Sequence, residues 1–468
     1  MNINTLCKNI KHYHDNIHGY INITNFAKKI IDTKYFQRLS KLYQLGVANY
    51  VYRNAVHTRF EHSIGTYYFA GEILDTILSC LQHDNSKIHD YLSSIPELQN
   101  YYQRTRTHKK TFILDEYICE LIKIAGLTHD IGHGCFSHVF DDSFIPDIGK
   151  SDHIYATHEA RSAKIIELII RNDESLNCIH DDEIKFIQTL INPTKSHVGF
   201  IYQIISNTLN GLDVDKFDYL TRDIYMIGFQ AKIDCGRLIK HIKIIDNNII
   251  YPEQATDDII NIFYTRYRLH NNVYCHKTVI AIEFMMVEIM KLLEPILHIS
   301  NNLDDMEKFC ILTDNYIIES INIIDTVKCF LTNYQLENFK KTKILWNKII
   351  TRQIYSNICI RTLKNKINEK LLVDNLSDSD KNNLVIFQRK IGFVSGNKPN
   401  PLDSIYVYKT KNPNEIYGKL NISKSKMNIL ELMPNGYQEY LLMIYYKNKT
   451  KYNKIKKLTE YYNNFVFT

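Results

Sequence analysis

The sequence predicts a mainly α-helical protein in which a large helical core is followed by a smaller lobe of mixed helices and strands. Only 9 prolines and 16 glycines occur among 468 residues, which disfavours an all-β protein with many turns. Apolar residues recur at helical spacing through much of the first 300 residues. After Pro401, short alternating runs such as "SIYVYK" are typical of strands.

The composition is that of a globular protein. Hydrophobic residues make up 45% of the chain and charged residues 23%, so it can bury a large core and is not disordered. The net charge of +6 suits an anionic ligand but does not by itself indicate nucleic acid. The 10 cysteines include no Cys-x-x-Cys pair, so neither a zinc knuckle nor a disulfide framework is expected. Because the N-terminus has no apolar secretory run, we expect a soluble intracellular protein, cytoplasmic or nuclear, with no membrane segment.

The helical elements follow in order along the chain. Segment 59–78, "RFEHSIGTYYFAGEILDTIL", and segment 115–130, "DEYICELIKIAGLTHD", each carry an apolar stripe. In the second segment, Ile118, Leu121, Ile122 and Ala125 recur at i, i+3, i+4 and i+7. Segment 278–297 carries acidic residues and a lysine among its apolar residues, so we expect a buried helix rather than a membrane span. Polar breaks at 92–110, 374–383 and 395–401 are expected to be loops.

The stretch "GLTHDIGHGCFSH", residues 126–138, concentrates polar chemistry at the end of a predicted apolar helix. A His-Asp dipeptide alone is weak, because this sequence contains five of them. His129-Asp130 differs in being followed by glycines, His133 and His138. An imidazole nitrogen beside a carboxylate oxygen suits a divalent transition metal, and glycines let a substrate approach the backbone closely. The stretch therefore predicts a metal site next to a substrate.

Further ligands must come from elsewhere in the chain. His62 lies near the start of the helix predicted over 59–78, and Asp215 lies on a helix with Tyr219 and Asp223 on the same face at i+4 and i+8. Each residue alone is more often an ordinary surface group, but their joint occurrence with the glycine-rich motif favours a metal site. The ordered set His62, His129-Asp130, Asp215 resembles that of the HD phosphohydrolase superfamily. Such a metal would lower the pKa of a water bound to it.

The likeness extends along nearly the whole chain. It is carried by "DNIHGYI", "IIDTKYFQRLSKLYQLG", "HTRFEHSIGTYYFAG", "AGLTHDIGHGCFSHVFDD", "THEA", "SNTLNGLDVDKFDYLTRD", "DDMEKFCILTDN" and "NPLDSIYVYKT". These segments resemble the SAM-and-HD-domain deoxynucleoside triphosphate (dNTP) triphosphohydrolases. The resemblance implies an HD-type core over 1–300, with its central motif region at about 57–223, and a helical and α+β lobe over 301–468. The SAM module of that family is expected to be absent, because the chain begins almost directly at the HD core.

The resemblance also implies a reaction and a set of roles. The reaction is metal-dependent hydrolysis of a dNTP to a deoxynucleoside and inorganic triphosphate. The implied catalytic residues, which surround the nucleophile and the 5′-oxygen, are His133, His138, Asp141 and His158. The implied phosphate-binding residues are Arg59, Lys216 and Arg266. The residues implied around the deoxyribose are Gln44, Leu45, Asp223 and Tyr274. Tyr219 and His270 are included as their neighbours on the same helices. Residues 265–277, "TRYRLHNNVYCHK", are predicted to form one continuous helical face, and Cys275 stands where the family usually has glutamine, which leaves the base preference open.

The regulatory sites match the family less well. The animal enzymes bind a guanine nucleotide and a deoxynucleotide between subunits and become active tetramers. Residues that match their nucleotide-binding positions are Lys11, Asp32, Gln37 and Arg237. Family residues are replaced at His14, Ser40, Pro252, Gln254 and Asp258. The resemblance implies a homo-oligomer, dimer or tetramer. The lost positive charge predicts that this oligomer depends only weakly on a guanine nucleotide activator.

Two other readings of the sequence stay open at this point. One keeps the metal but makes the protein a different HD-superfamily phosphohydrolase, such as a nucleotidase or phosphodiesterase; the three predicted phosphate-binding cations favour a triphosphate over that alternative. The other is a nucleic-acid-binding module using the basic run 104–110, which has no interleaved aromatic residues and is therefore less favoured. The metal is left open among iron, manganese, zinc and magnesium.

Overall fold

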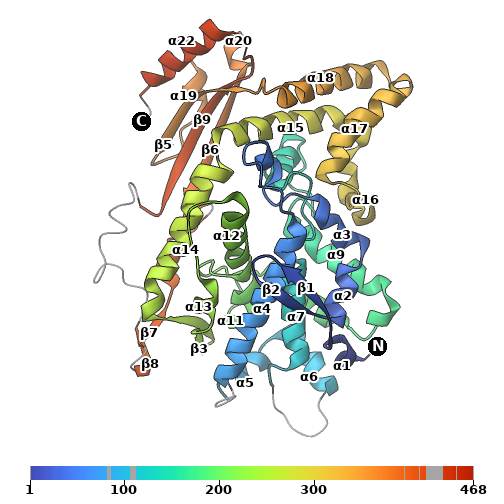
Figure 1. The fold of residues 1–468 in the computed structure, drawn as a ribbon, viewed down its shortest axis with the longest axis vertical. Helices are drawn as coiled ribbons and strands as arrows, with labels where there is room; N and C mark the ends of the chain where they lie inside the picture. Colours follow the sequence, from blue (N-terminus) through green and yellow to red (C-terminus); the bar gives the residue numbers. More distant parts are fainter. Residues whose placement is uncertain are drawn as a thin grey trace.

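The computed structural model describes residues 2–81, 86–105, 112–394, 396–409, 412–417, 436–449 and 451–466. It confirms a mainly α-helical protein with a smaller mixed lobe (Figure 1). The N-terminal and central helices are α1 (Ile3–Leu6), α2 (Asn25–Ile31), α3 (Lys34–Gln37), α4 (Arg59–Leu81), α5 (Ser86–Ser93), α6 (Gln99–Thr105), α7 (Glu116–Thr128), α8 (Ile145–Asp147), α9 (His158–Asn172), α10 (Asp181–Ile191), α11 (Phe200–Ile205) and α12 (Val214–Ile227).

The second half of the described chain holds the remaining helices. They are α13 (Cys235–Ile239), α14 (Thr256–Leu269), α15 (Lys277–Leu297), α16 (Met306–Phe309), α17 (Asp314–Val327), α18 (Asn333–Ile350), α19 (Glu369–Val373), α20 (Asp378–Lys381) and α22 (Tyr452–Asn463). The 3₁₀ turns are η1 (Arg38–Lys41), η2 (Gly46–Tyr50), η3 (Pro96–Leu98), η5 (Glu174–Leu176), η6 (Glu253–Ala255), η8 (Ile299–Asp304), η9 (Lys328–Phe330) and η10 (Pro401–Ser404). Two π-helical turns are η4 (Phe140–Phe144) and η7 (His270–Tyr274).

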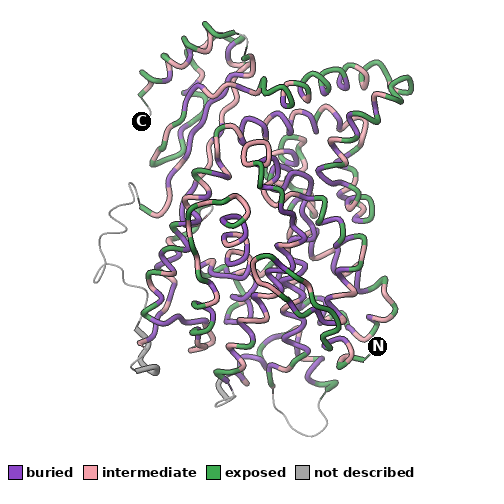
Figure 2. The backbone as a smooth tube through the Cα atoms, in the orientation of Figure 1, coloured by how far each residue is buried: buried purple, intermediate pink, exposed green. Residues whose placement is uncertain are grey.

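Helix α4 is the centre of the helical core. It packs on α7 and α12, while α10 packs on α7 and α9. The apolar stripe predicted for α7 is buried, and Ile118, Leu121, Ile122 and Ala125 have no exposed surface. Figure 2 shows the buried residues gathered along these central helices and the exposed ones along α18 and α22. The core thereby fixes the N-terminal ends of α4 and α12 beside the C-terminal end of α7.

The strands that the structure describes form three small sheets. The strands are β1 (Asn9–Asp15), β2 (Gly19–Thr24), β3 (Lys243–Ile245), β4 (Asn248–Pro252), β5 (Ser356–Leu363), β6 (Leu384–Gly392), β7 (Val407–Lys409), β8 (Asn412–Tyr417) and β9 (Gln438–Tyr446). Their orders are β1-β2, β3-β4-β7-β8 and β5-β9-β6. All pairs are antiparallel except β4–β7, where Tyr251 faces Val407. This parallel pair ties residues near 250 to residues near 407.

Buried apolar residues form two clusters. The larger runs from the N-terminal helices through α18 and includes one face of the β5-β9-β6 sheet. The smaller lies between the other face of that sheet and helices α19 and α22. The division of the chain at residue 300 into a core and a C-terminal lobe stays a prediction.

Most of the predicted elements are confirmed, and three are corrected. The loop predicted over 374–383 is wrong in part, because α20 (Asp378–Lys381) forms within it. The predicted helices over 59–78, 115–130 and 278–297 correspond to α4, α7 and α15. The continuous helix predicted over 265–277 is wrong, because α14 ends at Leu269 and the π-helical turn η7 follows. A π turn closes i→i+5 hydrogen bonds, so the i+4 phase of a continuous face is lost there. The loop predicted over 92–110 is wrong in part, because η3 and α6 form within it; residues 106–110 lie outside the described residues.

No helix of the described chain is long and apolar enough to cross a membrane.

Candidate metal and substrate site

The four predicted metal ligands come from three helix ends that the core brings together. His62 lies in the first turn of α4, and Asp215 lies in the first turn of α12. Helix α7 ends at Thr128, so His129 and Asp130 follow immediately in the chain. Asp213 caps the start of α12 by accepting a hydrogen bond from the Lys216 amide at 3.0 Å. Local capping and core packing therefore place residues far apart in sequence around one point.

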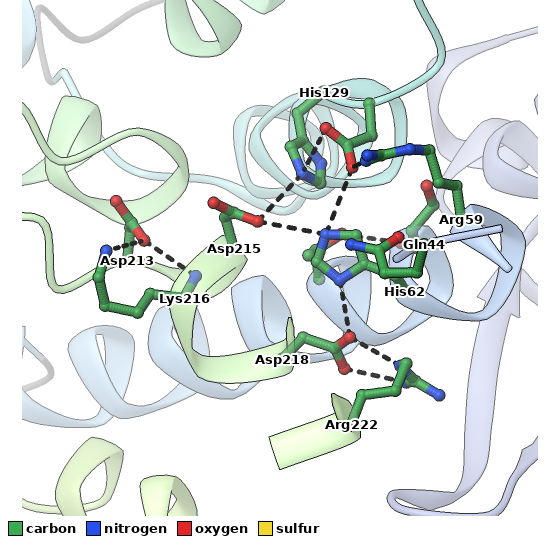
Figure 3. Close-up of polar contacts among 12 residues, drawn as sticks. Gln44, Arg59, His62, His129, Asp213, Asp215, Lys216, Asp218 and Arg222 are labelled. Atoms are coloured by element: carbon green, nitrogen blue, oxygen red, sulfur yellow. Dashed lines mark hydrogen bonds and ion pairs between the residues drawn. The ribbon is translucent and has the colours of Figure 1, made fainter. Parts of the chain in front are cut away.

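The four side chains approach one another closely, and Figure 3 shows His62, His129 and Asp215 pointing toward one another. His62 Nε2 lies 3.2 Å from Asp215 Oδ1 and 3.6 Å from Asp130 Oδ2. His129 Nε2 lies 3.3 Å from Asp130 Oδ1 and 3.6 Å from Asp215 Oδ1. Ligand atoms of His62, His129 and Asp130 all fall within 4.8 Å of one another. The Asp215 carboxylate is 41% exposed, so it faces the open side of this cluster.

The hydrogen bonds of the two imidazoles fix which nitrogen is free. His62 Nδ1 bonds to Asp218 at 2.8 Å, and His129 Nδ1 bonds to the Gly126 carbonyl at 2.7 Å. A carbonyl oxygen can only accept, so His129 must carry its proton on Nδ1, and the ionised Asp218 imposes the same tautomer on His62. Both Nε2 atoms are buried without a hydrogen-bond partner among the described residues. Two Nε2 atoms without hydrogen-bond partners, both facing the two carboxylates, fit a divalent metal ion.

The electrostatics of the cluster favour positive charge. Burial alone lowers the pKa of the His62 imidazole, but three neighbouring carboxylates raise it to about 10. Burial raises the pKa of Asp215, but the two imidazoles hold it well below its usual range. Asp218 accepts hydrogen bonds from His18 at 2.8 Å and from Arg222 at 2.8 and 2.9 Å, so this carboxylate is held in place from several sides.

The four predicted catalytic residues lie beside the metal cluster. The rings of His133 and His158 stack with centroids 3.8 Å apart, and His133 Nε2 lies 3.3 Å from Asp130 Oδ1. His158 Nδ1 bonds to Asp141 at 2.9 Å. Burial lowers the pKa of His158, but Asp141 and Glu159 raise it above its ordinary value; burial and nearby cations lower that of His133. The exposed His138 has its ring centroid 5.2 Å from that of His133.

Three predicted phosphate-binding cations line the same region. Arg59 donates from one nitrogen to Asp130 and from another to the hydroxyl of Ser137. Lys216 Nζ lies 3.8 Å from Asp213. The buried Arg266 donates to the carbonyl of Gly392 at the end of β6. Burial and the charges of nearby cations, Arg266 and Lys216 among them, hold the pKa of His270 well below its ordinary value. Arg59 therefore contacts the predicted ligand Asp130 directly, and the charges of Arg266 and Lys216 act on His270.

The predicted sugar-binding residues include a buried hydrogen-bonded chain. Asp223 accepts from Tyr274 at 2.5 Å and bonds to His57 Nε2 at 2.7 Å. Burial and the Asp223 carboxylate raise the pKa of the Tyr274 hydroxyl well above its ordinary value. Gln44 Oε1 is buried without a hydrogen-bond partner among the residues that the structure describes, so it can accept from a ligand hydroxyl. Leu45 and Tyr219 are partly buried against the main core.

The four predicted regulatory residues are all exposed. Lys11 lies on β1, and Asp32 ends α2 with an ion pair to Lys28 at 2.7 Å. The Gln37 amide donates to the Ile31 carbonyl, and Arg237 on α13 lies 3.8 Å from Asp258. The structure therefore places this set on the surface, apart from the buried histidines.

Several residues of the site were not singled out from the sequence. His57 and Asp218 are the main ones, because each holds a predicted site residue in place. Asp218 follows Asp215 at i+3 on α12, which is a readable signal for a supporting carboxylate on the same face. His57 lies in the quoted segment "HTRFEHSIG", but its partner Asp223 is 166 residues away. No spacing rule connects such a pair.

Known proteins resemble this chain over most of its length. A putative HD domain-containing protein, L394, of Acanthamoeba polyphaga mimivirus is 40% identical over 445 residues, which cover 92% of this chain and 91% of that protein. A deoxynucleoside triphosphate triphosphohydrolase SAMHD1 homolog of Dictyostelium discoideum is 31% identical, over 96% of this chain and 80% of that protein. The human deoxynucleoside triphosphate triphosphohydrolase SAMHD1 is 29% identical, over 94% of this chain and 70% of that protein. No family model matches the chain.

Proposed function

This chain belongs to the HD-domain family of SAMHD1-type deoxynucleoside triphosphate triphosphohydrolases, and we propose from that membership that it hydrolyses dNTPs to deoxynucleosides and inorganic triphosphate. The observation that carries the proposal is the pair of bare imidazole nitrogens facing Asp130 and Asp215, with cations beside them. The nitrogens and carboxylates can hold the metal that activates water, and the cations can bind a triphosphate.

The metal site is proposed to be His62, His129, Asp130 and Asp215. A divalent ion held there would supply Lewis acidity, activating water and offsetting phosphate charge. Two nitrogen and two oxygen ligands accommodate iron, manganese, zinc or magnesium. The hydrogen bonds at Nδ1 of both histidines support this assignment, because they orient each ring with its Nε2 toward the carboxylates.

The proposed reaction breaks the bond between the α-phosphorus and the 5′-oxygen. Water adds to the α-phosphorus and gives up a proton, the electrons of the broken bond pass to the 5′-oxygen, and that oxygen takes up a proton. His158 is proposed to hold the proton at Nε2, because its Nδ1 is engaged by Asp141. His133, stacked on His158, and the exposed His138 are proposed to contact the reacting phosphate.

The substrate is proposed to lie with its phosphates along Arg59, Lys216 and Arg266. Three cations suit a triphosphate better than a monophosphate, which disfavours a simple nucleotidase. The deoxyribose is proposed to pack against Leu45 and Tyr274, with a hydroxyl donating to Gln44 Oε1. Tyr219, Asp223 and His270 are proposed to complete the walls of this pocket. Arg104, from the basic run considered for nucleic acid, is bonded to the buried Glu183 instead.

The enzyme is proposed to act as a homo-oligomer with weak dependence on guanine nucleotides. Lys11, Asp32, Gln37 and Arg237 keep part of an activator site, but Ser40 and Asp258 offer no cation for a triphosphate. Turnover of dTTP with and without GTP, read alongside light scattering, tests this. A strict GTP requirement coupled to tetramer formation would refute it.

One assay tests the proposed reaction directly. Metal-loaded protein is incubated with each of the four dNTPs, and the products are resolved as inorganic triphosphate, pyrophosphate or phosphate. Triphosphate with free deoxynucleoside supports the proposal. Release of pyrophosphate or monophosphate would instead indicate a different HD-superfamily phosphohydrolase.

A further inference from the structure

The loop His129–His133 carries two proposed metal ligands, and most of its backbone carbonyls are held by side chains from outside it. Of its five carbonyls, that of Asp130 accepts from the His133 amide at 3.1 Å. The other four accept from the side chains of Arg38, Arg161 and Ser162. A buried backbone group without a partner is costly, so these donors decide which loop conformation is stable.

Arg38 supplies two of these hydrogen bonds. Its Nη1 donates to Ile131 at 3.3 Å, and its Nη2 donates to His133 at 2.6 Å. The same guanidinium donates from Nε and Nη2 to the carbonyl of Leu312, at 3.2 and 2.9 Å. Arg38 thus joins the motif loop to a segment 274 residues away from itself in sequence.

Helix α9 supplies the remaining hydrogen bonds from two adjacent residues. Arg161 Nε donates to Gly132 at 2.7 Å, and another nitrogen donates to Asp141. Ser162 accepts from the Gly132 amide at 2.9 Å and donates to the carbonyl of His129 at 2.7 Å. A Cβ on Gly132 would lie 2.4 Å from the Ser162 nitrogen, so only glycine lets α9 approach this closely.

Both guanidiniums are buried against one ring. Their central carbons lie 5.0 Å (Arg38) and 4.8 Å (Arg161) from the centre of Phe309. Arg161 has no exposed surface and Arg38 is 4% exposed. Cations over an aromatic face are stabilised there, and this matters more when water is absent. The ring therefore stabilises the two charges in an interior that would otherwise disfavour them.

We propose that Arg38, Arg161 and Ser162 are positioning residues for the metal: they set the backbone of the His129–His133 loop so that His129 and Asp130 face His62 and Asp215. The inference rests on the proposed metal site but does not depend on which nucleotide is hydrolysed. A lysine at 38 or 161 keeps the charge but loses the planar fork that reaches several carbonyls at once. Ser162→Ala removes one oxygen atom and with it two loop hydrogen bonds.

The test measures Mn²⁺ affinity by calorimetry on the metal-stripped full-length protein, for wild type and the variants Arg38→Lys, Arg161→Lys and Ser162→Ala. We expect each folded variant to bind Mn²⁺ roughly 10- to 100-fold more weakly, as is typical when groups supporting metal ligands are removed. With dNTP as substrate, kcat should fall by a similar factor while KM changes less than about 3-fold, because the phosphate-binding cations are untouched.

Two controls separate positioning from general stability. Arg171→Lys makes the same chemical change on an exposed part of α9, where Arg171 pairs with Glu167 and Asp181, and should leave Mn²⁺ affinity unchanged. Leu458→Ala weakens the separate core of the C-terminal lobe and should lower the melting temperature without changing Mn²⁺ affinity.

The outcomes decide the proposal in every case. If an arginine variant fails to fold, Ser162→Ala still tests the loop. Mn²⁺ affinity within 2-fold of wild type in Ser162→Ala and in each folded arginine variant overturns the proposal. A loss of Mn²⁺ affinity in Leu458→Ala equal to that in the loop variants also overturns the proposal. A wild-type protein that binds Mn²⁺ but releases no triphosphate would count against the proposed function alone.

Discussion

Replacing Asp218 by asparagine should separate metal affinity from stability. Asp218 accepts from His62 Nδ1 at 2.8 Å, and it also receives two hydrogen bonds from the buried Arg222. Asparagine has one acceptor oxygen, so its NH₂ group must face some of these donors. The His62 tautomer is then no longer fixed, and the Nε2 lone pair that faces the metal position is partly lost.

The expected magnitudes follow from these contacts. Loss of a group that orients a metal-bound histidine costs about 10- to 100-fold in metal affinity, or about 1.4–2.7 kcal/mol. Removing one partner of a buried ion pair costs about 3–5 kcal/mol. Arg222 keeps Asp15 at 2.8 Å as a second partner, so we expect the free energy of unfolding to fall by about 3 kcal/mol, the lower end of this range. A domain with about 5–15 kcal/mol of stability still folds after this loss.

The matched control is Asp15→Asn. Asp15 is the other carboxylate bound to Arg222, and it also accepts hydrogen bonds from the backbone amides of Ile17 and His18. Both variants should unfold at lower denaturant concentration than wild type, but only Asp218→Asn should bind Mn²⁺ more weakly in calorimetry. Equal Mn²⁺ affinities in the two variants would refute the assignment of Asp218 as the group that fixes His62.

Three further outcomes are expected. Asp130→Ala should abolish metal content and turnover, and it should also lower the melting temperature because it leaves the buried Arg59 without its carboxylate partner; retention of full metal in elemental analysis would contradict the ligand assignment. Leu45 and Tyr274 should make dGTP a better substrate than GTP by roughly 10²-fold in kcat/KM, because a filled wall rejects an added hydroxyl, and comparable rates would show the sugar pocket to be wrong. Burial raises the pKa of Asp314 to about 6 from 3.8, so its ionisation opposes folding: the stability it contributes is fully present below pH 3.8 and is lost as pH rises through about 6. Asp314→Asn should flatten this part of the stability curve between pH 4 and 6 in urea titrations, and an unchanged curve would contradict the shift.

The elements and the proposed ligands differ in how far the sequence could predict them. The helices α4, α7 and α15 were predictable because their apolar residues keep the 3.6-residue period. His129 and Asp130 were predictable because they are adjacent in the chain and lie at the end of such a helix. The π turn at His270–Tyr274 was not, because helical periodicity assumes that the period continues.

Contacts between distant segments account for most of what the sequence did not predict. His57 meets Asp223, and Arg38 meets Leu312, across 166 and 274 residues. Neither pair has a spacing that periodicity can detect. Buried Arg161 was equally unpredictable, since an arginine on a helix is usually exposed and three of its four partners here are backbone carbonyls. Sequence patterns therefore identified the side chains proposed to bind the metal, but not the residues that hold those side chains in place.

The contact between Arg38 and Leu312 has a consequence for synthesis of the chain. All four proposed metal ligands have left the ribosome once residue 215 has emerged, whereas Leu312 and Asp314, which accepts from the Phe136 amide at 2.6 Å, emerge roughly 100 residues later. At about 5–20 residues per second, this separates the two events by about 5–20 s. During that interval the nascent chain has all four proposed ligands but lacks the distal segment that holds the loop His129–His133. The metal supply in the cell and the speed of translation therefore both affect how the site is first loaded.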